Sequence, residues 1–299
     1  MTDDVERISR RARTLAAHLE PCIGQVYFAP ECHTAYEQLG FAPSPAELNG
    51  VAMPDGPAYF TSRGSLMGQV APHVVAAAFA VFNPDAVVPS VRHGWTLTDA
   101  ATIFAARRTG AVAQLRRIVG ESPQGLERAG DLFERAAESL RPEGRPLFAG
   151  LRTQWDDPTE PWVRFFHYGD MLREYRGDSH TAAWISAGVD ATEIGLLTEL
   201  YIGLPLRSYS RTRAWSDEQF DAATERLTER GWLHDGSFTA KGRDAREAIE
   251  VATDHQMVAA LDALDNDIDE LFAIIEPWGK AIRAAGGYIG GAGDLWPNR

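Results

Sequence analysis

Residues 215–243 read WSDEQFDAATERLTERGWLHDGSFTAKGR. Ser216 stands directly before an amphipathic run, and Gln219 lies three residues after Ser216. This spacing is the capping-box pattern at the start of a helix. Gly231 then predicts the end of that helix, because glycine readily adopts the left-handed conformation that closes one. Two short runs with Asp235-Gly236 between them are typical of a tight β-hairpin. The stretch therefore predicts a capped helix followed by a two-stranded hairpin.

Helical patterns flank this stretch on both sides. Apolar residues recur at helical spacing from Asp190 to Ile202 and again from Ala240 past Leu264. A helix, a second helix that ends in glycine, a hairpin and a long helix follow the plan of a winged helix-turn-helix unit. The runs RLTERGWL (226–233) and FTAKGR (238–243) resemble the corresponding helix end and helix start of MarR-type regulators.

Other segments resemble an actinobacterial family of similar length that is described only as helix-turn-helix proteins with no assigned role. They are VYFAPE (26–31), YFTSR (59–63), FNP (82–84) and, most distinctively, LREYRGDSH (172–180). This resemblance spans most of the chain and implies a fold class, although a scaffold does not fix a function. We expect a mainly α protein, in which a helical N-terminal part is followed by a winged helix-turn-helix unit with a small β-hairpin.

The segment RPEGRP (141–146) is the clearest candidate for a domain boundary, because it combines two prolines with a glycine. We expect a helical domain over 1–141, a helical hairpin plus the winged helix over 147–275, and a C-terminal tail over 276–299. The helical spacing predicts these helices: 3–20 ended by Pro21, 31–39, 71–81, 99–119, 123–140, 159–176 and 178–187, with a loop at 41–57.

The formal net charge of −13 argues against duplex DNA as a partner, since phosphate neutralisation supplies most of the affinity for DNA. The helix at 216–230 would enter the major groove, yet it carries five acidic residues against Arg226 and Arg230. Three arginines just before this helix could touch phosphates or lie solvated in a loop: Arg207, Arg211 and Arg213.

The chain has no apolar run long enough to span a bilayer and no signal-peptide pattern at its first residues. We therefore expect a cytoplasmic protein with no membrane partner. Cys22 and Cys32 match neither a zinc nor a redox pattern, and no dinucleotide, phosphate-loop or zinc-protease motif is present. No metal and no cofactor are expected.

Three polar residues gather on one side of the helix expected at 160–176. His167, Asp170 and Glu174 fall together there, opposite the apolar stripe. Imidazole and carboxylate groups at this spacing can hold a metal ion, transfer protons or simply form a solvated polar face. The sequence leaves these three interpretations open.

Arg173 and Arg176 lie within or beside the apolar stripe, where an unpaired charge is costly. Either their stems cover apolar surface while the charge reaches water, or they meet an acid or clamp an anionic ligand. Gly177 predicts the end of the helix, with Asp178 as the cap of the next one. His180 would then lie in a first helical turn, where the helix dipole favours a neutral imidazole that can act as a general base.

The candidate catalytic residues are His180, Glu174 and Asp178. The candidate ligand-binding residues are Arg173, Arg176, His167, Tyr27, Phe60 and Arg63. The leading hypothesis is a pocket for a small, anionic metabolite, used for binding or for biosynthetic catalysis, on a winged-helix scaffold that has lost DNA binding. The alternative is a MarR-like regulator that responds to a ligand and, as a homodimer, combines the arginines of two subunits into a basic face. A protein-binding module is a third hypothesis, and the sequence does not decide whether any reaction is catalysed.

Overall fold

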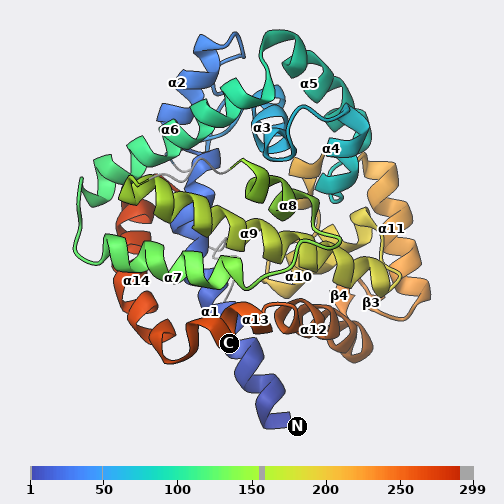
Figure 1. Cartoon of the computed structure of the whole chain (residues 1–299). Coiled ribbons are helices and arrows are strands. Elements are labelled where there is room, and N and C mark those ends of the chain that lie inside the picture. Colours follow the sequence, from blue (N-terminus) through green and yellow to red (C-terminus); the bar gives the residue numbers. More distant parts are fainter. Residues whose placement is uncertain (1, 49, 155–158, 290–299) are drawn as a thin grey trace.

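A computed structural model describes residues 2–48, 50–154 and 159–289. In this part of the chain the fold is mainly helical, with two short antiparallel hairpins, as the sequence predicts for the fold class. One long helix, α9 (Pro161–Ser186), runs through the middle of the molecule (Figure 1). Buried side chains occur on every side of α9, because helices from both ends of the chain pack around it.

The elements before α9 surround it on more than one side (Figure 1). They are α1 (Thr2–Ile23), η1 (Gly24–Tyr27), α2 (Pro30–Gln38), β1 (Glu47–Leu48), β2 (Val51–Ala52), α3 (Gly56–Gly64), η2 (Ser65–Met67), α4 (Pro72–Phe79), α5 (Pro84–Leu97), α6 (Ala100–Val119), α7 (Leu126–Glu138) and α8 (Pro146–Thr153). The predicted cap of the long helix is confirmed, since the Asp99 carboxylate accepts a hydrogen bond from the backbone N–H of Thr102 at 2.8 Å.

The elements after α9 are α10 (Ala191–Tyr201), η3 (Ser210–Arg213), α11 (Asp217–Glu229), β3 (Leu233–His234), β4 (Ser237–Phe238), α12 (Ala240–His255), α13 (Val258–Leu264), η4 (Asp265–Asp267) and α14 (Ile268–Ala284). Both halves of the predicted capping box between Ser216 and Gln219 are present. Gly231 has a φ of 68°, and the hairpin turn at Asp235-Gly236 has φ angles of 48° and 72°. The local chemistry of 215–243 therefore gives the predicted helix and hairpin.

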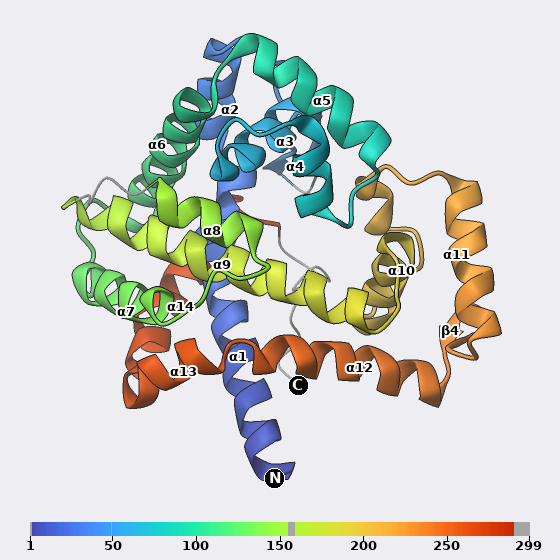
Figure 2. The same cartoon turned by 45° about the vertical axis from the view of Figure 1, so that its right-hand side comes forward.

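Two apolar clusters form the core. The larger one combines α1, α6, α7, α8 and most of α9 with α13 and α14, so it takes members from both sides of residues 141–146. The smaller one joins the end of α9 to α10, α11, β3 and α12. Along α9, Tyr175 is the last member of the larger cluster and Ala183 the first member of the smaller one. Residues 176–181 therefore lie between the two clusters along α9. Figure 2 shows α9 running from the side of α7 and α8 toward α10.

Several predicted boundaries were wrong. The first helix continues past Pro21 to Ile23, because a proline in the last turn removes one hydrogen bond only and its ring packs against Gly279 of α14. The loop at 41–57 contains the β1–β2 hairpin. The long helix from Ala240 ends at His255, and α13 follows as a separate helix.

The predicted break at Gly177 was also wrong. Helix α9 is continuous from Pro161 to Ser186, so there is no hairpin of two helices at 159–187. Packing on all sides of α9 outweighs the low helix propensity of a single glycine, which costs about 1 kcal/mol. Asp178 and His180 consequently lie in the middle of a helix, and the first-turn position expected for His180 does not exist.

Candidate functional site

A cavity of about 280 Å³ lies where α9 passes between the two apolar clusters. Residues of α1, α3, α4, α9, α10, η3 and α12 line it, so it is bounded by both the N-terminal helices and the segment from α10 to α12. Its apolar wall includes Leu15 and Leu19 of α1 and Phe79 at the end of α4. A cavity that combines apolar walls with a few converging polar groups is the usual form of a small-molecule site.

Most of the candidate residues meet in this cavity. Those that line it are Arg63, Arg173, Glu174, Arg176, Asp178 and His180. Five of these lie on α9, where residues three and four positions apart share a face. Arg63 reaches the cavity from α3. In the sequence, the only sign that Arg63 could contact a ligand was its place beside Tyr59 and Phe60 in a glycine- and proline-rich stretch.

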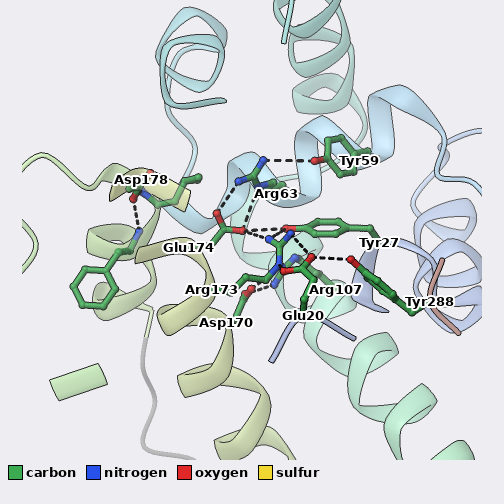
Figure 3. Close-up of polar contacts among 12 residues, drawn as sticks. Glu20, Tyr27, Tyr59, Arg63, Arg107, Asp170, Arg173, Glu174, Asp178 and Tyr288 are labelled. Carbon is green, nitrogen blue, oxygen red and sulfur yellow. Dashed lines mark hydrogen bonds and ion pairs between the residues drawn. The ribbon is translucent and has the colours of Figure 1, made fainter. Parts of the chain in front are cut away.

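Glu174 is the centre of the charged network on the cavity wall (Figure 3). Its carboxylate accepts hydrogen bonds from Arg63 Nη2 at 2.7 Å, from Arg173 Nη1 at 2.9 Å and from the Tyr27 hydroxyl at 3.0 Å. Burial opposes its ionisation, but the guanidinium groups of Arg63 and Arg173 outweigh burial and hold the pKa of Glu174 at about 2. A carboxylate held this firmly is a structural anchor and a poor general acid or base at neutral pH.

Arg173 and Arg176 meet protein carboxylates. Arg173 donates to both oxygens of Glu20 at 3.0 Å as well as to Glu174. Arg176 donates from Nη2 to Glu250 at 2.5 Å and to Asp254 at 3.0 Å, both of which are buried on α12. Of the interpretations that the sequence left open for these arginines, the structure shows the meeting with acids. An external anion at either arginine would have to compete with two carboxylates.

Asp178 joins α9 to α8. Its carboxylate accepts hydrogen bonds from the backbone N–H groups of Leu147 and Phe148 at 3.0 and 3.1 Å, so it caps α8 instead of the predicted helix after Gly177 (Figure 3). Burial, reinforced by the negative charge of Glu174, raises the pKa of Asp178 to about 7 despite these two bonds. Asp178 is therefore the carboxyl group in the cavity wall that can exchange a proton near neutral pH.

His180 is neutral, as expected, but for a different reason. Burial and the nearby Arg246 and Arg176 lower its pKa to about 3, although Glu250 opposes them. Its Nδ1 lies 3.0 Å from the hydroxyl of Thr253, which itself donates to the carbonyl of Ile249. The Thr253 hydroxyl proton is thus used, so Nδ1 carries the imidazole proton and Nε2 is left as an acceptor.

The remaining candidates lie outside the cavity. Tyr27 supports it from behind through its bond to Glu174, and Phe60 packs among the rings of Tyr59, Phe79 and Phe82. His167 is buried beside the ring of Tyr168, and burial together with Arg108 and Arg107 lowers its pKa to about 3.

The triplet His167, Asp170 and Glu174 forms neither a metal site nor a solvated face. All three side chains are buried. Asp170 is paired with Arg107 of α6, whereas Glu174 is paired with Arg63 and Arg173. Among the described residues, no three His, Cys, Asp or Glu side chains are grouped so as to hold a metal ion. The prediction of a polar face from helical spacing was wrong because residues 161–176 of α9, where the triplet lies, include no solvent-exposed side chain.

The helix-turn-helix segment has an acidic surface. The five acidic residues of α11 are exposed: Asp217, Glu218, Asp221, Glu225 and Glu229. Arg207 donates to Asp221 at 2.6 Å and Arg211 to Asp217 at 2.8 Å, while Arg226 pairs with Asp190 and Glu193. These arginines neutralise acidic residues of the same protein.

A family model described as a helix-turn-helix family matches residues 12–289. The chain belongs to this helix-turn-helix family. Neither a curated protein nor a solved structure matches the chain. None of the described helices is long and apolar enough to cross a membrane. The family description names a fold, so the ligand and the chemistry of this helix-turn-helix protein have to be argued from its cavity.

Sequence reasoning missed several residues of the site in this helix-turn-helix protein. Arg246, Glu250 and Asp254 recur every four residues on the buried face of α12, and that pattern of charges among apolar positions was the available signal. Trp184 and Arg213 line the cavity without any local signal. The partners of α9 were missed because they come from distant segments.

Proposed function

We propose that this helix-turn-helix protein binds a small molecule in the cavity between α9 and the α10–α12 segment. The observation that carries the proposal is the cavity itself, which has a volume of about 280 Å³ and joins aromatic walls to charged side chains. One of these charged residues, Arg213, has no carboxylate partner in the described part of the chain. Apolar walls that meet a few converging polar groups are the usual form of a small-molecule site.

A reaction in the same cavity is part of this proposal. Asp178, whose pKa is about 7, is the group that could move a proton, whereas Glu174 is held by two arginines and His180 has a pKa of about 3. We keep Asp178 as the candidate acid or base and His180 as a candidate hydrogen-bond acceptor for the reacting ligand through Nε2, and we assign Glu174 to the support of Arg63 and Arg173. A cytoplasmic location fits either a binding or a catalytic role.

A MarR-like, ligand-responsive regulator is the second candidate. Family membership favours it, and the order of α10, α11, the β3–β4 hairpin and α12 follows the winged-helix plan. The exposed acidic residues of α11 count against DNA binding, because they would repel phosphates. A regulator of this kind would need to form a homodimer that presents to DNA a basic face other than the surface of α11.

Filling the cavity tests the binding proposal. Gly177 is exposed on the cavity side of α9, and a Cβ added there would meet only Glu174 Oε2, at 3.9 Å. Gly177→Leu therefore places a side chain in the cavity at a position that tolerates one. Ala182→Leu adds the same side chain to the exposed surface of α9, outside the cavity, and is the matched control.

The measurement is a thermal-shift screen of small acids, alcohols and amines against the unaltered protein and both variants. A ligand at one hundred times its Kd stabilises the native state by about 2.7 kcal/mol. We expect compounds that raise the Tm of the unaltered protein and of Ala182→Leu, with the shift abolished in Gly177→Leu. Compounds that act equally on all three proteins would place binding elsewhere and overturn the proposal.

A further inference from the structure

Arg213 differs from the other arginines of the cavity. Five arginines line it, and four of them form ion pairs with carboxylates: Arg63, Arg173, Arg176 and Arg246. Arg213 donates to the hydroxyls of Tyr209 and Thr212 and has no carboxylate partner in the described part of the chain. Its guanidinium carbon lies 4.5 Å from the ring centroids of both Phe82 and Tyr209.

The backbone around Arg213 is firmly placed. Its carbonyl accepts a hydrogen bond from the N–H of Asn83 at 2.9 Å, and the Asn83 side chain donates to the carbonyl of Ala214 at 3.0 Å. The indole N–H of Trp215 donates to the carbonyl of Val81 at 2.9 Å. These three bonds fix the end of η3 against the turn after α4, so the arginine is held at the cavity wall before any ligand arrives. Such preorganisation lowers the entropic cost of binding.

Two aromatic rings compensate the charge of the partly buried Arg213 only in part. A cation–π contact contributes about 0.5–2 kcal/mol, whereas a guanidinium readily makes two charge-assisted bonds to one carboxylate. The cavity wall therefore has one positive charge without a carboxylate partner among the described residues, and a ligand that supplies a negative charge would complement it.

The rest of the wall selects for an aromatic or otherwise apolar body. Six aromatic side chains line the cavity: Tyr59, Phe79, Phe82, Trp184, Tyr201 and Tyr209. A volume of about 280 Å³ is at the lower end for small-molecule sites and suits a compound of one or two rings. We propose, resting on the small-molecule function above, that the ligand is a compact aromatic monoanion whose carboxylate or similar group binds Arg213.

This assignment replaces the two arginines suggested by the sequence. Arg173 and Arg176 are neutralised by Glu20, Glu174, Glu250 and Asp254, whereas Arg213 was first considered as a phosphate contact for DNA. Its neighbour Arg211 is exposed, pairs with Asp217 and does not line the cavity. The two arginines are two residues apart in sequence, but only Arg213 lines the cavity, which makes Arg211 a matched control.

The probes are 2-naphthoate, 2-naphthamide and 2-naphthylmethylammonium, which share a ring system and differ in charge. Isothermal titration at pH 7.5 should show that the unaltered protein binds the acid at least tenfold more tightly than the amide and the amine. In Arg213→Gln this preference should vanish, in Arg213→Lys it should be largely restored, and in Arg211→Gln it should be unchanged. Circular dichroism of each variant confirms that it is folded, and the Lys variant distinguishes lost charge from lost structure.

The outcomes separate this inference from the proposed function. If the acid and the amide bind equally well and Gly177→Leu blocks both, the cavity binds small molecules but the anionic assignment is overturned. If the acid binds and Gly177→Leu has no effect, the site is elsewhere and both proposals fail. If the acid preference persists in Arg213→Gln, another group carries the recognition, and if the acid does not bind at all the assignment is likewise overturned.

Discussion

Arg107 on α6 and Asp170 on α9 form a two-point ion pair inside the protein. Nη1 and Nη2 of the arginine lie 2.6 and 3.2 Å from the two carboxylate oxygens, and each side chain is 1% exposed. The guanidinium also faces the rings of Tyr27 and Phe166, at 5.7 and 5.6 Å from their centroids. The pair ties the N-terminal helices to α9 directly behind the charged wall of the cavity (Figure 3).

Removing the acid from this pair should destabilise the protein strongly. Asp170→Ala leaves a buried guanidinium without its carboxylate, and breaking a buried pair in this way costs about 3–5 kcal/mol. Urea unfolding followed by circular dichroism gives the change in the free energy of unfolding. Glu270→Ala removes one carboxylate from Arg128 at the surface, where solvent screens the pair, and should change the free energy of unfolding far less. Equal, small effects of the two substitutions would contradict the structural role assigned to the buried pair.

The pKa of Asp178 predicts how stability depends on pH. The native pKa of about 7 lies above the value near 3.8 in the unfolded chain. Between these values the native state binds a proton that the unfolded chain has released, so the free energy of unfolding falls as the pH rises from about 4 to about 7. A shift of this size corresponds to at most about 4 kcal/mol.

Asp178→Asn isolates that contribution. The amide oxygen can still accept a hydrogen bond from Leu147 or Phe148, but the side chain no longer titrates. The stability of the variant relative to the unaltered protein should therefore increase between pH 4 and pH 7 and then level off. Urea unfolding at several pH values measures the difference. A difference in stability that stays constant from pH 5 to pH 7 would show that Asp178 caps α8 as an anion and that its native pKa is not raised.

Local sequence chemistry predicted the helix-turn-helix segment well. The caps at Asp99 and Ser216, the helix end at Gly231 and the hairpin turn after it all depend on side chains and backbone within a few residues. The same reasoning correctly marked residues 172–180 as unusual, because charged residues recur there on positions that an amphipathic helix would bury.

The partners of that segment could not be predicted. Arg173 meets Glu20, which is 153 residues earlier, and Arg176 meets Glu250, which is 74 residues later. A helical wheel shows which residues share a face but not which helices cover it, so the buried face of His167 and Asp170 was taken for a solvated or metal-binding one. The break at Gly177 was predicted for a similar reason, since tertiary packing overrode local propensity.

Gly177→Ala should stabilise the protein. Gly177 lies inside α9 with helical backbone angles, and the added Cβ would make only an ordinary contact at 3.9 Å. Replacing an interior helical glycine by alanine contributes about 0.5–1 kcal/mol, chiefly because the unfolded chain loses conformational freedom. Differential scanning calorimetry should therefore show a Tm higher by a few degrees. A lower Tm would show that α9 requires glycine at this position, for example because the cavity wall must move inward.

The acidic surface of α11 predicts that the protein does not bind duplex DNA. We expect no retention of random duplex DNA at about 50 mM salt, where non-specific phosphate contacts are strongest. Replacing both Asp217 and Asp221 by Asn frees Arg211 and Arg207 from their ion pairs, so this double variant should gain weak binding that disappears as salt increases. Fluorescence anisotropy of a labelled duplex measures both proteins across a salt series. Tight, steeply salt-dependent binding by the unaltered protein would contradict the prediction and favour the regulator, with a basic face supplied by its dimer.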